Sequence, residues 1–219
     1  MFGLAALAIA SVVAPGGFSA EITNPYLPLR PGSTWRFRGS DEGERTTEIV
    51  TVTRQVKVIQ GAPCVVLRDR AFSEGKLSEE TTDWYSQASD GTVWYFGEAT
   101  RTVDSKGRTV SREGSWQAGV NGARPGIFMP AKPRVGAIHR QEIYRGHAED
   151  KFRIDSLNGS VTVPYKRFRG NLLVTHEWTR LEPGVRDRKY YARGIGVVRE
   201  ESIRGGNETN SLVSFSRGR

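Results

Sequence analysis

The amino-acid sequence predicts an all-β protein, a single antiparallel sheet curled into a barrel or half-barrel, with a β-sandwich as the alternative. Two observations lead to this fold class. Short segments that alternate apolar and polar residues recur along the chain, and no stretch of about ten residues shows the helical period of about 3.6 residues. Clusters of Gly, Pro, Asn and Asp separate these segments, which indicates roughly ten short strands joined by turns.

The start of the chain differs in composition from the rest. Residues 1–20 carry no charged side chain and include the apolar run 4–13, which is shorter than the roughly 20 residues that span a bilayer. This pattern is typical of a secretory signal peptide cleaved after Ser19 or Ala20, although a buried N-terminal helix would also be apolar. We therefore expect a signal peptide over 1–20, a single β-rich domain over 21–219, and export to the periplasm or the extracellular space.

Composition and charge narrow the range of partners. The 219 residues include five Trp, seven Tyr and nine Phe, enough aromatic surface for a packed core, and carry a formal net charge of +8. Lys and Arg are interspersed with Asp and Glu, which favours a solvated surface over a nucleic-acid interface. The single cysteine, Cys64, lies in the apolar segment 62–67, so we expect no disulfide and no lipid anchor, and no later segment is expected to span a membrane.

The expected strands follow one another along the chain. Segment 34–38 alternates large apolar and charged residues, segment 46–59 is rich in Thr, Val and Ile and fits one or two strands, and the apolar segment 64–68 comes next. The second half of the chain supplies further strands at 138–144, 151–157, 172–178, 189–192 and 195–200.

The clearest hairpin lies between two aromatic runs. Asp90-Gly91 is the signature of a two-residue type I′ turn, so residues 83–89 should pair with 92–98, with Asp83 facing Glu98 and Tyr85 facing Phe96. Since directly opposed residues share a face, one face of the hairpin is expected to carry Tyr85, Trp94 and Phe96 beside Asp83 and Glu98, and the other face Trp84 and Tyr95. Aromatic residues on both faces indicate a pair covered on both sides, by the core on one and by a ligand or a loop on the other.

Segment 114–135 is rich in Gly and Pro and reads as a long loop beside this hairpin, and loops of that length are usually functional or mobile. It contains Trp116, an aromatic residue suited to stacking on a sugar ring.

Few residues have a spacing that indicates catalysis. His139, His147 and His176 are too widely spaced to suggest a metal site, and fingerprints for a cofactor or phosphate are absent, so we expect no metal and no cofactor. Carboxylates remain: paired Asp and Glu residues act as general acid and base in glycan cleavage. The candidates are Asp83, Glu98, Glu142, Glu149 and Asp150, with Gln141 beside them, although structural ion pairs with neighbouring Arg and Lys residues explain the same pattern.

Three motifs carry a family resemblance. They are Tyr26-Leu-Pro-Leu-Arg-Pro-Gly-Ser-Thr-Trp35, Asp83-Trp-Tyr85 with Val93-Trp-Tyr-Phe-Gly-Glu98, and Tyr190-Tyr-Ala-Arg-Gly-Ile-Gly196. Together they resemble a family of uncharacterised exported bacterial proteins, a resemblance that implies no particular activity. A looser resemblance, to half-barrel lipoprotein carriers of the LolA/LolB type, rests on an early Gly-x-x-Trp and a late Tyr-x-x-Gly-x-Gly, and it implies carriage of a lipid.

These observations support three hypotheses about function. The first is an exported, non-catalytic protein that holds a small apolar or amphiphilic ligand on a concave β-surface. The second is a carboxylate-dependent enzyme that degrades a polysaccharide, for which the charge of +8 suits an acidic glycan. The third is a structural or interaction module of the cell envelope, marked by an exposed apolar patch. The residues predicted to bind the ligand or glycan are Tyr85, Trp94, Phe96, Glu98, Trp116, Gln141, Glu142, Glu149 and Asp150.

Overall fold

The computed structural model describes residues 17–218, and every regular element in that range is a β-strand. The all-β prediction is therefore confirmed. The strands are β1 (Phe18–Ser19), β2 (Thr34–Asp41), β3 (Glu44–Ile59), β4 (Ala62–Ser73), β5 (Lys76–Ala88), β6 (Val93–Val103), β7 (Thr109–Ser111), β8 (Trp116–Gln117), β9 (Arg124–Met129), β10 (Ile138–Arg140), β11 (Glu142–Ile143), β12 (Lys151–Thr162), β13 (Arg167–Trp178), β14 (Arg186–Ala192), β15 (Gly196–Arg204) and β16 (Thr209–Ser216).

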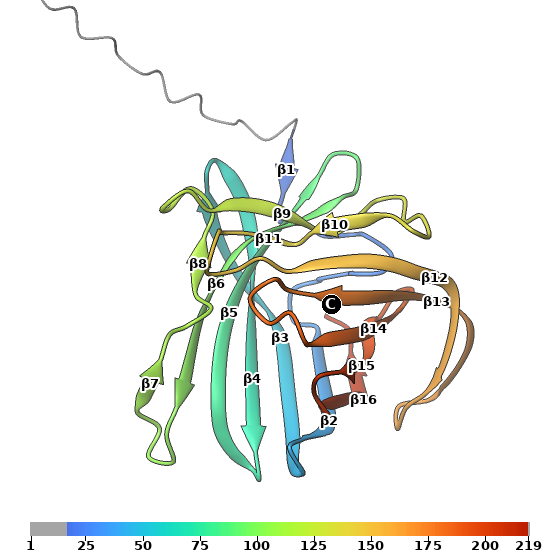
Figure 1. Ribbon diagram of the computed structural model, residues 1–219. Helices are drawn as coiled ribbons and strands as arrows, with labels where there is room; N and C mark the ends of the chain where they lie inside the picture. Colours follow the sequence, from blue (N-terminus) through green and yellow to red (C-terminus); the bar gives the residue numbers. More distant parts are fainter. Residues whose placement is uncertain (1–16, 219) are drawn as a thin grey trace, which may run out of the picture.

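The strands form one antiparallel sheet that curls into a nearly closed barrel (Figure 1). The strand order is β10-β12-β13-β14-β15-β16-β2-β3-β4-β5-β6-β9-β11, so most neighbours in space are also neighbours in sequence. The pairing of β16 with β2 joins the last strand to one near the start of the chain, and β6–β9, β9–β11 and β10–β12 are also pairs of strands that do not follow each other in sequence. The single-sheet barrel is therefore confirmed, and the β-sandwich alternative is wrong.

The two ends of the sheet meet at residues 140–142. β10 and β11 lie at opposite ends of the strand order, yet only Gln141 separates them along the chain. The backbone N–H groups of Gln141 and Glu142 donate to the carbonyl oxygen of Asp150, at 2.9 and 3.3 Å. We call Gln141, Glu142 and Asp150 the seam, because these residues link the two ends of the sheet.

Alternation along the strands sends one set of side chains into the barrel. In β2, Trp35 and Phe37 are buried whereas Arg36 and Arg38 are exposed, as the sequence pattern predicts. The Trp35 indole Nε1 donates to the carbonyl oxygen of Ile195 at 2.8 Å, so the buried polar atom of the ring is satisfied.

The Gly- and Pro-rich segment 114–135 is not the loop expected from its composition. It contains β8 and β9, which both pair with β6. The glycine at position 126 allows close approach of two backbones, because a Cβ atom there would lie 2.4 Å from the carbonyl oxygen of Gln141. This glycine therefore marks tight strand packing beside the seam and not a flexible loop.

The aromatic hairpin forms, but its register differs from the expected one. Asp83 faces Glu98 and Trp84 faces Gly97 as predicted, whereas Tyr85 faces Tyr95 and not Phe96. The cause is a β-bulge at Gly97, whose φ of 126° and close approach to β8 suit only glycine. One extra residue in β6 reverses the alternation, so the expectation that Trp94 and Phe96 share a face with Tyr85 is wrong.

The N-terminal segment continues into the sheet. The predicted signal peptide lies mostly outside the described residues, but Phe18 and Ser19 form β1 and pair with β5. The Phe18 ring packs edge-on against Trp94 and Phe96, at centroid distances of 6.3 and 5.3 Å. The aromatic residues on the outer face of β6 are therefore covered by β1. Within residues 17–218 no helix has the length and hydropathy needed to cross a bilayer.

Candidate functional site

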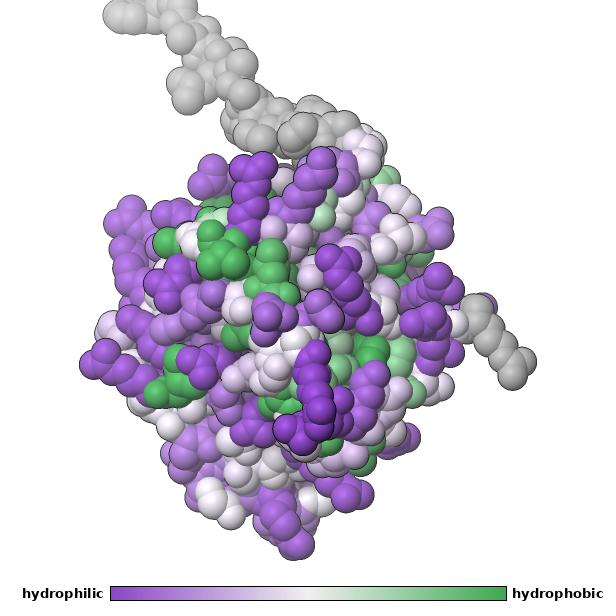
Figure 2. All heavy atoms as spheres, turned by 90° about the vertical axis from the view of Figure 1, so that its right-hand side faces the viewer, coloured by the Kyte–Doolittle hydropathy of each residue, from purple (hydrophilic) through white to green (hydrophobic). Residues whose placement is uncertain are grey.

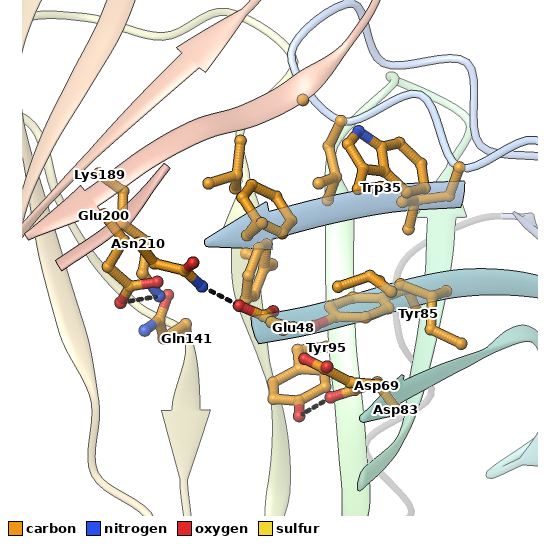
Figure 3. A pocket seen from close by; sticks show the side chains of 18 of the residues that line it. Trp35, Glu48, Asp69, Asp83, Tyr85, Tyr95, Gln141, Lys189, Glu200 and Asn210 are labelled. Carbon is orange, nitrogen blue, oxygen red and sulfur yellow. Dashed lines mark hydrogen bonds and ion pairs between the residues drawn. The ribbon is translucent and has the colours of Figure 1, made fainter. Parts of the chain in front are cut away.

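A cavity of about 290 Å³ lies inside the barrel (Figure 3). Its wall has an apolar part and a polar part. The apolar part consists of Leu27, Leu29, Trp35, Phe37, Val50, Leu67, Tyr85, Tyr95, Phe128 and Val197. The polar part consists of Glu48, Asp69, Asp83, Gln141, Glu142, Asp150, Lys189, Glu200 and Asn210. Val50 and Phe128 are only partly buried.

Aromatic rings form the centre of the apolar part. Tyr85 and Tyr95 stack with their centroids 4.6 Å apart and an interplanar angle of 14°, because the bulge at Gly97 places them opposite each other. Phe128 from β9 packs edge-on against both rings, at 5.0 and 5.6 Å, and Trp116 packs edge-on against Tyr95 at 5.4 Å. The rings fix one another, so this part of the wall is preorganised.

Asp83 lies where the aromatic and acidic parts meet. The Tyr95 hydroxyl donates to Asp83 Oδ1 at 2.7 Å, and the Asp83 residue is only 9% exposed. Burial raises the pKa of Asp83 to about 6, and the hydrogen bond from Tyr95 limits this rise because it favours the charged form. In β3 and β4, burial and the neighbouring Glu48 raise the pKa of Asp69 well above its usual value.

The seam adds further carboxyl groups with raised pKa values. Burial, followed by repulsion from Asp150, raises the pKa of Glu142 to about 8. Glu98 lies beside Asp83 across the β5–β6 pair, and burial with repulsion from Asp83 raises its pKa to about 9. Burial also raises the pKa of Asp150. At neutral pH the cavity therefore holds both protonated and ionised carboxyl groups.

One lysine lies among these acids. Lys189 Nζ is 3.2 Å from Glu177 Oε2 and 3.1 Å from Glu200 Oε1. Burial opposes the charged form of Lys189, but Glu177 and Glu200 together hold its pKa well above the usual value. Burial raises the pKa of Glu200 to about 7, while Lys189 lowers it. The ammonium group of Lys189 is therefore engaged at the far side of the polar wall (Figure 3).

Two acceptor atoms on the polar wall have no hydrogen-bond partner among the described residues. They are Asn210 Oδ1 and Asp69 Oδ1, both buried. The other polar atom of the Asn210 side chain, Nδ2, donates to Glu48 Oε2. Unpaired acceptors are costly inside a protein, so these atoms indicate a place where a donor is missing.

The structure brings some of the predicted site residues together and separates others. Tyr85, Gln141, Glu142 and Asp150 line the cavity. Trp116 and Glu98 do not line it but contact residues that do, Trp116 packing on Tyr95 and Glu98 lying across from Asp83. Trp94, Phe96 and Glu149 lie elsewhere. The first two face β1, and Glu149 forms an ion pair of 2.7 Å with Arg180, which holds the pKa of the Glu149 carboxyl below its usual value.

Part of the polar wall was not predicted from the sequence, namely Glu48, Asp69, Lys189, Glu200 and Asn210. A signal for two of them was present. Glu48 precedes Val50 by two positions and Asp69 follows Leu67 by two, so each carboxylate occupies an inward position of a strand whose next inward residue is apolar. Such a position can be recognised as part of a site only when the fold shows that acids from several strands line the same cavity.

The barrel and its cavity define a class, a single-sheet β-barrel with an internal cavity that is aromatic on one side and acidic on the other. No protein-family model and no curated protein matches the sequence. Among solved structures, a Bacteroides fragilis protein inferred to be exported, with a YmcC-like fold, has a TM-score of 0.50 at 13% identity, over 88% of this chain and 99% of that one. A Parabacteroides distasonis protein inferred to be a lipoprotein has a TM-score of 0.44 at 11% identity, with the same coverage. The first likeness shows the fold.

Proposed function

We propose that this protein is an exported binding protein that holds a small amphiphilic molecule in the barrel cavity. The observation that carries the proposal is the division of one cavity of about 290 Å³ into an aromatic side and a carboxyl side. A volume at the lower end of the range for ligand sites, roughly 300 to 1,000 Å³, suits a small molecule and not a polymer chain.

The structure of the wall supports binding. Tyr85, Tyr95 and Phe128 are held by mutual edge and stacking contacts, so a ligand would lose little free energy in ordering them. Burial of about 150 Å² of apolar ligand surface on this wall contributes about 4 kcal/mol, at about 25 cal/mol per Å². Hydrogen bonds to the polar wall add specificity.

Export is supported by two independent features. Residues 1–20 have the composition of a secretory signal, and the Bacteroides fragilis protein with the similar fold is inferred to be exported. The proposed location is the periplasm or the extracellular space.

Native mass spectrometry of the protein purified gently from a bacterial host tests the proposal. The wild-type protein should carry an additional small-molecule mass that denaturation releases. Val50→Trp fills the cavity and should abolish this mass, whereas Val58→Trp, at a position on the same strand that is 68% exposed, should retain it. Two results together would contradict the proposal. They are a wild-type protein without added mass, and a thermal unfolding midpoint that no small molecule of a broad library shifts.

A second candidate, a carboxylate-dependent enzyme that cleaves a glycan, is favoured by one observation. The pKa values of Asp83 and Glu142 are about 6 and about 8, so at neutral pH one carboxyl is ionised and the other protonated. Two such groups in one cavity are the requirement for general acid–base chemistry. The test is the release of reducing ends from a panel of acidic and neutral glycans. Release by the wild type that Glu142→Gln abolishes would favour this candidate, and no release by the wild type would exclude it.

The third hypothesis, an interaction module, depends on an exposed apolar patch. Figure 2 shows a face that is mostly hydrophilic, with hydrophobic side chains in small, separate patches. Isolated apolar side chains are normal on a protein surface, so this face gives that hypothesis no support.

A further inference from the structure

The charges of the cavity are unbalanced. Six carboxyl side chains and a single ammonium group line it, and the ammonium group of Lys189 has its close contacts with Glu177 and Glu200. Within residues 17–218, Glu48, Asp69 and Asp83 form no ion pair. Buried negative charge without a cation is expensive, so these carboxyl groups either keep a proton or receive a positive charge from elsewhere.

The hydrogen bonds of the polar wall independently indicate that a donor group is absent. Asn210 is only 9% exposed and lines the cavity. Its Nδ2 donates to Glu48, and among residues 17–218 its Oδ1 has no donor. Asp69 Oδ1, on the same wall, also lacks one. Asn210 Oδ1 is an acceptor, and Asp69 Oδ1 is one once the carboxyl is ionised, so a group with several hydrogen-bond donors would satisfy both atoms.

The apolar part of the wall determines what the rest of the partner must be. Tyr85 and Tyr95 present stacked rings beside Asp83, and Phe128 and Val50 extend the apolar surface. Aromatic faces attract cations as well as apolar groups. A molecule that fits both walls is apolar at one end and a positively charged donor at the other.

We propose that the ligand of this cavity is an organic cation, a primary amine on an aromatic or aliphatic body, with its ammonium group held among Glu48, Asp69 and Asn210. This inference rests on the proposed function and specifies its ligand class. A primary ammonium group has three N–H donors and no acceptor, which matches a wall that lacks donors. A metal ion fits less well, because in the described part of the chain no group of three or more His, Cys, Asp or Glu residues has the geometry to hold one.

Binding of a cation to this wall should release protons. The pKa of Asp83 is about 6 and that of Glu142 about 8. Several ionisable groups face Asp83, and only one of them is basic. They are Glu48 from β3, Asp69 from β4, Glu79 from β5, Glu98 from β6, Glu142 from β11 and Lys189 from β14, besides the Tyr95 hydroxyl. An added positive charge lowers these carboxyl pKa values, so the amine should bind more tightly as pH rises from 5 to 8, a range in which an alkylammonium group stays charged.

Glu142 has a comparable set of neighbours. Asp150 and Asp83 raise its pKa by repulsion, and Lys189 and the Trp116 side chain lower it. Since the negative groups outnumber the one lysine, deprotonation of the cluster makes the cavity more negative and favours a cation.

Isothermal titration calorimetry tests the inference with three primary amines, 2-phenylethylamine, tryptamine and hexylamine, and with their matched neutral alcohols. At least one amine should bind the full-length protein, its alcohol should bind about tenfold or more weakly, and the heat should differ between Tris and phosphate buffers because protons are released. Asp69→Asn keeps the shape of the wall. It should lower the affinity for the amine about ten- to hundredfold, with little effect on the affinity for the alcohol. Asp104→Asn, in an exposed turn, is the control and should change neither.

The other outcomes distinguish this inference from the function on which it rests. Equal binding of amine and alcohol, without proton release, would contradict the cationic ligand class. It would leave the proposed binding function unaffected. If CaCl₂ displaces the amine from the wild-type protein, and Asp69→Asn abolishes Ca²⁺ binding, the wall binds an inorganic cation and the inference is wrong. A co-purified mass that belongs to an anionic or neutral molecule would overturn it as well. Absence of any bound mass together with no binding of amine or alcohol would contradict both proposals.

Discussion

Replacement of Asp83 by Asn should stabilise the protein at pH 8. Asp83 is a carboxyl group that is only 9% exposed, and its neighbours Glu48 and Glu79 repel its charge. Asn has the same shape, and its side-chain oxygen can still accept the hydrogen bond that Tyr95 donates at 2.7 Å. The substitution therefore removes the buried charge and leaves the contact.

The size of the effect follows from the pKa. The pKa of Asp83 is about 6 in the folded protein against an ordinary value of 3.8, and each unit of difference in pKa corresponds to about 1.4 kcal/mol. A raised folded-state pKa gives a stabilising contribution that is complete below about pH 4 and is lost as pH rises through about 6. At pH 8 the charged Asp83 thus costs up to about 3 kcal/mol, and we expect Asp83→Asn to recover about 1–3 kcal/mol.

Urea unfolding followed by Trp fluorescence at pH 5 and pH 8 measures this effect. The free energy of unfolding of Asp83→Asn should exceed that of the wild type at pH 8, and the difference should be smaller at pH 5, with unchanged m values. Asp104→Asn provides the contrast, because hydrogen bonds from Arg108 hold the pKa of Asp104 below its usual value and its loss should give no gain at pH 8. An Asp83→Asn protein that is no more stable than wild type at pH 8 would refute the reasoning.

Three further predictions concern the frame of the barrel. Gly126→Ala places a methyl group 2.4 Å from the carbonyl oxygen of Gln141 and should lower the free energy of unfolding by about 1–3 kcal/mol in a urea titration, whereas Gly184→Ala, with no atom within 4 Å, should have little effect. In the chain that retains residues 1–20, Phe18→Ala removes a ring that packs on β6 and should cost about 1–2 kcal/mol in the same assay; an unchanged midpoint would show that β1 does not contribute to stability. Burial raises the pKa of the Cys64 thiol to about 12, so iodoacetamide at pH 8 should label this thiol only after unfolding, and rapid labelling of the native protein would contradict its burial.

The fold class was predictable because it depends on local pattern. Alternation in segment 34–38 marks the buried Trp35 and Phe37, and the Asp-Gly pair at 90–91 marks a hairpin whose existence the structure confirms. These signals lie within a few residues of one another, so no long-range information is needed to read them.

The register of that hairpin was not predictable from its turn alone. The bulge at Gly97 depends on the approach of β8, a strand that lies in a segment whose glycines and prolines suggested a loop. The continuity of the sheet depends on the pairing of β16 with β2, which joins residues such as Phe215 and Trp35. No local pattern specifies contacts between such distant positions.

The candidate site was also predictable only in part. Tyr85, Glu142 and Asp150 were identified because aromatic and acidic residues cluster in their segments, and they do line the cavity. Glu48 and Asp69 look like ordinary surface acids in the sequence. Their importance arises because curvature of the sheet turns their face of β3 and β4 inward, and curvature is a property of the whole barrel.

A crystal structure of the protein purified gently from a bacterial host, without added ligand, would show whether the cavity holds a small molecule. We expect density for such a molecule in the cavity, with an apolar body on Tyr85 and Tyr95 and a donor group within hydrogen-bond distance of Asp69 Oδ1 and Asn210 Oδ1. A cavity that contains only ordered water, or one that has closed so that Phe128 meets the acidic wall, would contradict this expectation.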